Sequence, residues 1–156
     1  MVKRILPVKW KVADWGQLSK TELYQILRLR SEVFVVEQNC AYQDLDEKDK
    51  QAFHLMGFDA KNNLVAYARI LHPNVSYPEP SIGRVVTSSK VRRNGIGKLL
   101  MQETMKFITK QFGNTPVRIS AQSYLLKFYS EFGFKKVGKE YLEDNIPHHE
   151  MLYSAN

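Results

Sequence analysis

The chain has 156 residues, enough for a buried core, and we expect a single domain over its whole length, 1–156. Its 44% hydrophobic and 25% charged residues, with eight tyrosines and eight phenylalanines, exclude a disordered chain. One cysteine excludes an intramolecular disulfide, and no apolar run reaches the roughly 18 residues of a membrane span, so we expect a cytoplasmic protein without a membrane partner. The net charge of +7 leaves nucleic acid, an anionic membrane and a phosphate-rich cofactor open.

The first half of the chain predicts a short strand at residues 9–12, then a helix. Ser19 and Glu22 have the spacing of a capping box, which satisfies free N–H groups at a helix start. The apolar residues that follow at helical spacing are Leu23, Ile26, Leu27, Val33 and Phe34. Arg30 interrupts this apolar face, so we expect it to point toward a cleft or a salt bridge.

Next comes a polar, acidic stretch, residues 39–50, which predicts a loop. Two strands follow at 53–58 and 64–71, joined by a turn-rich stretch. Three prolines make residues 72–81 irregular.

The second half of the chain predicts a strand, a glycine-bearing turn and a long helix, followed by three more strands and one more helix. The β-branched and alternating runs predict strands at 82–87, 117–121, 134–137 and 149–153. A further helix is expected from about residue 123 to residue 132, ending at Gly133, which readily adopts a left-handed conformation. This order indicates an α+β fold with a strand, a turn and a helix at its centre.

The turn before the long helix carries the most information. Free N–H groups in the first turn of a helix, together with its dipole, bind anions. Gly95 and Gly97 allow a diphosphate to approach the backbone, while Arg92, Arg93 and Lys98 add positive charge. Two glycines alone also fit an ordinary tight turn. The succession of strand, basic cluster and helix favours a pyrophosphate site, and the spacing matches neither a P-loop nor a dinucleotide fingerprint.

Arg92, Gly95 and Gly97 after a β-branched strand resemble the acyl-CoA signature of the GNAT superfamily of N-acetyltransferases. FYSEFGF at 128–134 resembles the second motif of that family, while LRSEVFVVEQ at 29–38 and EDNIPH at 143–148 resemble its ElaA-like branch. The resemblance covers almost the whole chain. It implies a GNAT-like α+β acyltransferase fold, with a central mixed, mostly antiparallel sheet of about six to seven strands flanked by about four helices.

The resemblance further implies an N-acetyltransferase that moves an acetyl group from acetyl-CoA, as co-substrate, onto a primary amine by direct attack in a ternary complex. Backbone groups of the fourth strand would pair with the pantetheine arm and the acetyl carbonyl, and backbone N–H groups of the turn would hold the pyrophosphate. Gln122 stands where the family often has an asparagine that contacts the cofactor. The expected cofactor-binding residues are Val85, Val86, Thr87, Arg92, Arg93, Asn94, Gly95, Ile96, Gly97, Lys98 and Gln122.

Acetyl transfer needs a neutral amine, a donor for the oxyanion and a proton for the leaving thiolate. Tyr129 matches the tyrosine of the family's Tyr-x-x-x-Gly-Phe pattern and is expected from the resemblance to supply that proton, although its spacing alone favours a core tyrosine. The oxyanion donor is expected to be the N–H of Val86 or of a neighbour. Glu37 is a candidate base, acting directly or through water, but it also fits a salt bridge to Arg30 or Arg84.

The acceptor site is less defined by the sequence. Its expected residues are Arg30, Gln38, His54, Arg84 and His148. Both of these histidines titrate in a useful range for a base, although packing explains His54 more simply, and His149 is expected on a strand surface.

The charges around this site leave the acceptor's own charge open. Arginines at 30, 69 and 84 would hold a carboxylate of the acceptor. The acidic residues at 44, 46, 47 and 49 form either a solvated loop or an attraction for a cationic acceptor.

Two other functions remain open. A non-catalytic acyl-CoA-binding protein would use the same turn, and a nucleic-acid-binding module would use the positive charge. The chain lacks a recognition helix flanked by basic residues, an RNP-like aromatic strand and a zinc finger, so we expect no nucleic-acid partner. No Cys/His spacing indicates a metal, and no nearby pattern activates Cys40 as a nucleophile. Exposed strand edges permit a homodimer, and small-molecule and peptide amines both remain open as partners.

Overall fold

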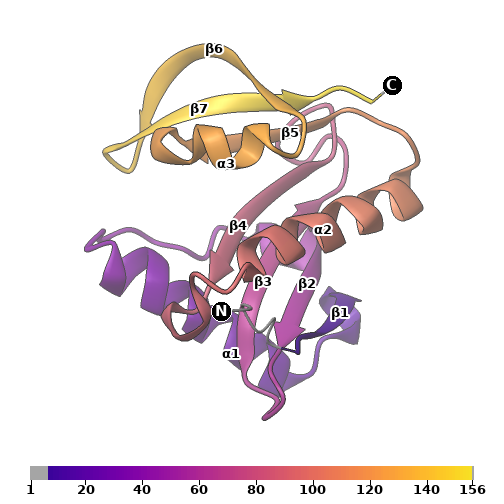
Figure 1. Cartoon of the computed structure of the whole chain (residues 1–156), viewed down its shortest axis with the longest axis vertical. Helices are drawn as coiled ribbons and strands as arrows, with labels where there is room; N and C mark the ends of the chain where they lie inside the picture. The colour runs from indigo at the N-terminus through magenta and orange to yellow at the C-terminus, as the bar shows by residue number, and fades with distance from the viewer. Residues whose placement is uncertain (1–6, 156) are drawn as a thin grey trace, which may run out of the picture.

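A computed structural model describes residues 7–155 and contains one seven-stranded sheet with the order β1-β2-β3-β4-β5-β7-β6. The strands are β1 (Lys9–Asp14), β2 (Ala52–Phe58), β3 (Leu64–Leu71), β4 (Ser81–Thr87), β5 (Val117–Gln122), β6 (Phe134–Glu143) and β7 (Ile146–Tyr153). The α-helices are α1 (Lys20–Arg30), α2 (Ile96–Phe112) and α3 (Leu126–Ser130) (Figure 1). Only β4 and β5 pair in parallel, so the mixed, mostly antiparallel sheet is confirmed. The described residues form three α-helices, one π-helical turn and several 3₁₀ turns, which agrees approximately with the expected number of helices.

Helix α1 begins at the capping box that the sequence predicts. The Ser19 hydroxyl accepts a hydrogen bond from the Glu22 N–H at 3.0 Å, and the Glu22 carboxylate accepts one from the Ser19 N–H at 2.9 Å. After Arg30 the chain widens into a π-helical turn, Ser31–Glu37, a local distortion often found at functional sites. After this turn, Glu37 contacts Arg92 and Gln38 contacts Gln122, the last residue of β5.

The two long helices are packed in separate hydrophobic clusters of the sheet. Ile26 and Leu29 of α1 cluster with Tyr67 and Val86. Leu100, Met101 and Ile108 of α2 cluster with Ile70, Ile82 and the residues of β5. Every residue of β3 is buried, as expected for a strand covered on both faces.

Strands β4 and β5 diverge along their length. They pair only at Ser81–Arg118 and Ile82–Ile119. Beyond these pairs β4 bulges: Arg84, at φ 51°, and Val85 stand where β3 offers a single residue. Figure 1 shows β5, β6 and β7 forming an upper layer, and β4 running down from it toward β3. The carboxyl-terminal half of β4 therefore has an edge without a strand partner on the β5 side.

The last two strands are longer than the sequence indicates. Strands predicted at 134–137 and 149–153 extend to Phe134–Glu143 and Ile146–Tyr153. Asp144 and Asn145, at φ 50° and 62°, form the two-residue hairpin turn that joins these longer strands. Pro147 lies inside β7 and has no N–H to donate. The last residue of β5, Gln122, pairs with His148, so no residue of β5 lies opposite Pro147 and no hydrogen bond to β5 is lost.

The helix predicted over residues 123–132 forms in two pieces. A 3₁₀ turn, Ser123–Leu125, precedes the five-residue α3. Gly133 follows at φ 90°, the left-handed conformation that the sequence predicts. This short helical segment places Tyr129 beside β5 and β6.

Candidate active site

The glycine turn forms an anion-binding geometry beside the unpaired edge of β4. Gly95, at φ 75°, is the N-cap of α2, and no side chain caps the helix start. Nothing lies within 4 Å of the position that a Cβ would take at Gly95. The first-turn N–H groups of α2 are therefore left without side-chain acceptors, and their partial positive charge suits a phosphate. The structure brings the expected residues from Arg93 to Lys98 together at this point.

The three cations of the turn have different surroundings. Arg92 binds both carboxylate oxygens of Glu37 and donates to the Thr87 carbonyl oxygen at 3.1 Å. The Nζ atom of Lys98 lies 3.7 Å from a carboxylate oxygen of Glu131, the residue that follows α3. The side chain of Arg93 is exposed and makes no ion pair or hydrogen bond within residues 7–155. Arg93 is thus the cation of this turn whose charge is least engaged in the described part of the chain.

The register of β4 decides which of its backbone groups face the gap. The Ser88 N–H donates to the Val65 carbonyl oxygen at 2.8 Å, so Ser88 is hydrogen-bonded toward β3. Antiparallel ladders alternate, which directs the backbone groups of Val86 toward β3 and those of Thr87 away from it. The Val86 side chain is buried in the α1 cluster. The expected oxyanion donor is the N–H of Val86 or of a neighbour. Because the Val86 N–H is directed toward β3, the geometry favours the N–H of a neighbour.

Tyr129 lies on the side of β5 covered by α2 and α3. Its ring contacts the rings of Phe128 and Phe134, with centroids 5.2 and 6.3 Å away, and only 7% of the residue is exposed. Burial raises the pKa of Tyr129, and the nearby Tyr124 adds to the shift, so the phenol keeps its proton at neutral pH. Tyr129 is therefore packed like a core tyrosine. The same burial keeps its hydroxyl protonated, so it can still donate a proton.

The opposite face of β5 carries a polar group of residues. Val117, Ile119 and Ala121 belong to the cluster that contains Tyr129, so alternation places Gln122 on the other face. The Gln122 amide donates to the side-chain oxygen of Gln38 at 3.5 Å.

His148 is the cross-strand partner of Gln122 and shares its face. The structure therefore brings three expected residues, Gln38, Gln122 and His148, to one surface next to the gap.

The ring nitrogens of His148 have distinct partners. Nδ1 lies 2.7 Å from the Ile146 carbonyl oxygen, and Nε2 lies 3.1 Å from a carboxylate oxygen of Glu143. Because a carbonyl oxygen only accepts, Nδ1 carries a proton, and Nε2 faces the Glu143 carboxylate. Tyr141 stacks on the ring at 6.1 Å. The sequence analysis did not identify Glu143 or Tyr141 as site residues. The signal that could have found them is the two-residue turn at Asp144 and Asn145, because it pairs β6, which carries both residues, with β7.

Arg30 does not reach this surface. It is fully buried, with Nε 2.8 Å from Asp44 and Nη1 2.7 Å from Asp49. Arg84 binds Asp44 at 2.7 Å, and Arg69 binds Asp46 through both terminal nitrogens at 2.7 and 2.8 Å. The salt-bridge alternative for Arg30 is the observed one.

The same contacts correct the prediction of a solvated acidic loop. Asp44 and Asp49 are 6% and 7% exposed, because the loop turns back onto arginines of α1, β3 and β4. Burial alone would raise the pKa of Asp46, but the adjacent Arg69 guanidinium holds it at about 2. Three arginines and three aspartates thus neutralise one another, and their charges are not offered to an acceptor.

His54 is packed, as its simpler explanation predicts. Its Nδ1 lies 2.7 Å from the Tyr67 hydroxyl and its Nε2 2.9 Å from the Asp49 carbonyl oxygen. Burial lowers the pKa of His54, and the nearby charges of Arg30 and Arg69 lower it further, so the ring is neutral and has no exposed surface. His54 therefore contacts the arginine–aspartate network through the backbone of Asp49, and no contact joins it to Gln38 or Gln122 in the described chain.

His149 corrects another expectation. It was predicted on a strand surface but is 9% exposed, and its Nδ1 lies 3.0 Å from the Ser123 hydroxyl and 3.9 Å from Glu140. The 3₁₀ turn that begins at Ser123 lies against β7, which covers a side chain that strand alternation alone leaves open.

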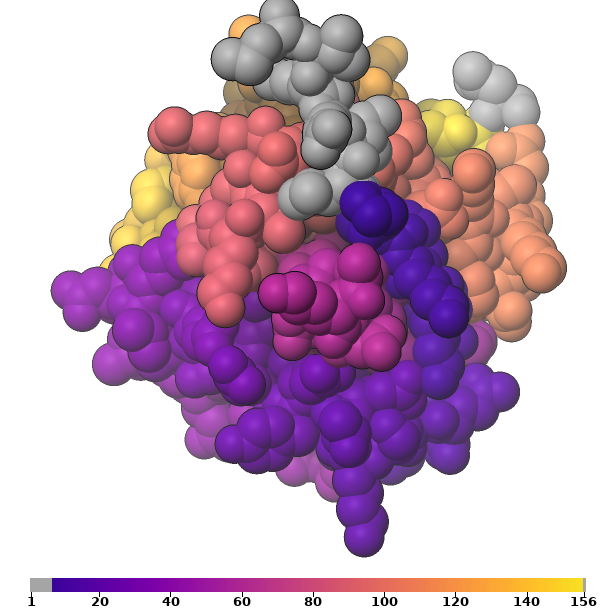
Figure 2. Space-filling model, turned by 60° about the horizontal axis from the view of Figure 1, so that its bottom comes forward, coloured from indigo at the N-terminus to yellow at the C-terminus, as the bar shows by residue number. Residues whose placement is uncertain are grey.

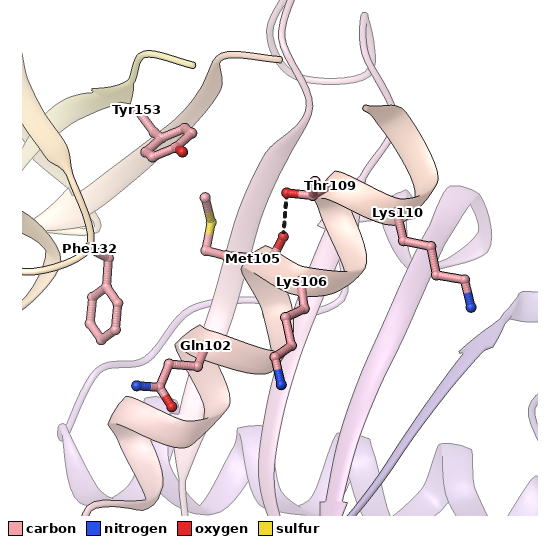
Figure 3. Close-up of a pocket in the computed structure, with 7 residues that line it drawn as sticks. All are labelled: Gln102, Met105, Lys106, Thr109, Lys110, Phe132 and Tyr153. Atoms are coloured by element: carbon pink, nitrogen blue, oxygen red, sulfur yellow. Dashed lines mark hydrogen bonds between the residues drawn. The ribbon is translucent and has the colours of Figure 1, made fainter. Parts of the chain in front are cut away.

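A separate groove of about 640 Å³ runs between α2 and the residues Phe132 and Tyr153. In Figure 3, Met105 points toward these two rings, while the ammonium groups of Lys106 and Lys110 point away from them. None of the expected site residues lines this groove.

In residues 7–155, no group of three or more His, Cys, Asp or Glu side chains is arranged to hold a metal ion. Within the same range, no helix has the length and apolar character needed to cross a membrane.

Comparison with known proteins identifies the family. The model of the acetyltransferase (GNAT) domain matches residues 18–155. A UPF0039 protein of Synechocystis is 42% identical over 148 residues, which cover 95% of this chain and 96% of that protein. Protein ElaA of Escherichia coli is 41% identical over 143 residues, covering 90% and 93%. The crystal structure of an acyl-CoA N-acyltransferase from Pseudomonas aeruginosa matches with a TM-score of 0.90 at 40% identity, covering 95% of this chain and 100% of that one. The chain belongs to the GNAT acetyltransferase domain family and has ElaA among its relatives.

Proposed function

We propose that the protein is an N-acetyltransferase that moves the acetyl group of acetyl-CoA to a primary amine while both are bound. One observation carries the proposal: the unpaired edge of β4 leads directly to the uncapped start of α2. An extended pantetheine arm fits the first as an added strand, and a pyrophosphate fits the second. Membership of the GNAT family supports the same pairing of strand edge and helix start.

The two faces of β5 separate the two substrates in this proposal. Val85 and Thr87 provide backbone groups for the cofactor arm, and the turn from Arg93 to Lys98 provides N–H groups for the phosphates. Tyr129 lies on the helix-covered face of β5. Gln122 lies on the other face with Gln38 and His148, where the acceptor enters. An amine there attacks the thioester through the gap between β4 and β5.

The chemical step follows from these positions. The amine nitrogen forms a bond to the thioester carbon, and the carbonyl oxygen becomes an oxyanion held by a backbone N–H beside Val86. The carbon–sulfur bond then breaks with its electron pair going to sulfur. Tyr129, which keeps its proton at neutral pH, gives that proton to the thiolate. Holding both substrates together supplies most of the rate gain.

We assign proton removal from the amine to His148. Its Nδ1 is held by the Ile146 carbonyl oxygen, so the amine meets Nε2 once the half-exposed Glu143 carboxylate, 3.1 Å away, turns aside, and Glu143 stabilises the ring after it has taken the proton. Glu37 is the weaker candidate, because Arg92 engages both of its carboxylate oxygens. It lies at the rim of the acceptor side, one residue before Gln38.

We propose that the acceptor is a primary amine of a small molecule or a peptide. We also propose that the reaction takes place in the cytoplasm. Polar, uncharged amides of Gln38 and Gln122 line its entrance, and the arginine–aspartate network behind them is internally neutralised. We also propose that the edge strands β1 and β6 permit a homodimer.

Thiol release across a panel of primary amines tests the proposal. Acetyl-CoA with an accepted amine should release CoA at least about a hundredfold faster than acetyl-CoA alone, consistent with general acid–base catalysis. Binding of acetyl-CoA without release for any amine would favour the non-catalytic acyl-CoA-binding protein. Binding of RNA or DNA in preference to CoA, weakening steeply with salt, would favour the nucleic-acid-binding module.

A further inference from the structure

Arg92 joins three segments that are distant in the sequence. Its guanidinium binds both oxygens of Glu37, 55 residues away, and donates to the Thr87 carbonyl oxygen at 3.1 Å. Figure 2 shows the corresponding surfaces in contact: the salmon turn after β4 lies against the violet segment after α1. A two-pronged arginine–carboxylate contact fixes direction as well as distance, so the π-helical turn is held in one position relative to β4.

The side chain of Arg92 points backward along the chain. Its contacts are five residues earlier, at Thr87, and on the π-helical turn, whereas the uncapped N–H groups lie ahead of it at the start of α2. Arg93, the next residue, is exposed and makes no polar contact within the described residues. Adjacent arginines therefore have different surroundings: one is bound to protein groups and the other faces solvent beside the helix start.

The contact to Glu37 continues to the acceptor side. Gln38 follows Glu37 at the end of the π-helical turn, and its side-chain oxygen accepts from the Gln122 amide at 3.5 Å. Gln122 in turn is the cross-strand partner of His148. A shift of Glu37 would therefore move Gln38 and alter the wall that an amine meets.

We infer that Arg92 is a positioning residue for the amine acceptor and not a ligand of the cofactor's phosphates. It acts through Glu37 and Gln38, and Arg93 supplies the side-chain charge to the pyrophosphate. This inference rests on the proposed acetyl transfer. It reverses the role that the position of Arg92 in the glycine signature would suggest.

Four variants test this assignment: Arg92→Gln, Glu37→Gln, the double variant, and Arg93→Gln as the matched control. CoA affinity is measured by calorimetry, and KM and kcat for an accepted amine by thiol release. Arg92→Gln should raise KM for the amine about two- to fivefold with CoA affinity within about twofold, since both side chains of this ion pair are more than a third exposed and solvent screens their attraction. Glu37→Gln should do the same, and the double variant should show no further loss, because both substitutions break one contact. Arg93→Gln should weaken CoA binding about five- to tenfold and leave KM for the amine unchanged.

The outcomes separate the inference from the proposed function. Loss of CoA affinity in Arg92→Gln equal to that in Arg93→Gln would overturn the inference, as would an unchanged KM for the amine in Arg92→Gln. A wild-type protein that binds no CoA would defeat the proposed function itself. If the wild type bound CoA but acetylated no amine, acetyl transfer and the acceptor role of Arg92 would both be refuted, and the CoA affinities would still show which arginine binds the phosphates.

Discussion

Replacing Arg30 with methionine should destabilise the protein severely. The guanidinium is fully buried and makes charged hydrogen bonds at 2.8 Å to Asp44 and 2.7 Å to Asp49. Removing one partner of a buried ion pair costs about 3–5 kcal/mol. We expect the lower end, about 3 kcal/mol, because Asp44 keeps Arg84 at 2.7 Å and Asp49 keeps Arg69 at 3.1 Å.

Urea unfolding measures this loss. With a slope of about 2 kcal/mol/M, the midpoint of Arg30→Met should fall by about 1.5 M. Arg28→Met is the matched control, since Arg28 lies on the same helix with its side chain 66% exposed and pairs only with Glu32 in the described chain. An exposed pair of this kind contributes about 0.5 kcal/mol or less, so the control should unfold near the wild-type midpoint. Equal midpoints for the two variants would refute the claim that the buried network holds the acidic loop in place.

Three further predictions concern the site and its surroundings. Tyr129→Phe should lower the rate of amine-dependent thiol release about a hundredfold or more at unchanged CoA affinity, and an unchanged rate across pH would remove its role as the acid. Gly95→Ala should destabilise the protein by about 1–2 kcal/mol in urea unfolding because of the left-handed φ of 75°, whereas Gly83→Ala, also with open space around its Cβ position, should be tolerated; equal effects would contradict the strain argument. The pKa of Asp46, lowered from 3.8 to about 2 in the folded protein, implies stability that is present above about pH 4 and is lost as the pH falls toward 2. Asp46→Asn should flatten the pH dependence of the unfolding midpoint in that window, and an unaltered slope would exclude the Arg69 contact as its source.

Local signals in the sequence predicted most elements correctly. The capping box at Ser19, the left-handed Gly133 and the β-branched run that ends at Thr87 each depend on residues a few positions apart, and each is found in the structure. The turn at Gly95 was identified for the same reason, since strand, glycine and helix follow one another directly. Chemistry carried by consecutive residues can be read before the fold is known.

Contacts between distant segments were not predicted. The acidic residues were expected either in a solvated loop or facing a cationic acceptor, whereas the arginines that neutralise Asp44 come from α1 and β4, 14 and 40 residues away. Glu37 was considered as a base or as a salt-bridge partner of Arg30 or Arg84, and its observed partner is Arg92, 55 residues away on the glycine turn. The length of β6 was missed for a similar reason, as its second half gains a partner only through the turn at Asp144.

Calorimetric titration with acetyl-CoA, and with ATP as a second phosphate-rich ligand, shows whether β4 and the glycine turn bind the cofactor together. We expect acetyl-CoA to bind to one site at least about tenfold more tightly than ATP, since the edge of β4 adds contacts to the pantetheine arm that ATP lacks. Gly95→Ala should weaken that binding by distorting the start of α2. Equal affinity for the two ligands, or no binding of acetyl-CoA, would contradict the assignment of the turn from Arg93 to Lys98 as the pyrophosphate site and of β4 as the strand that holds the cofactor.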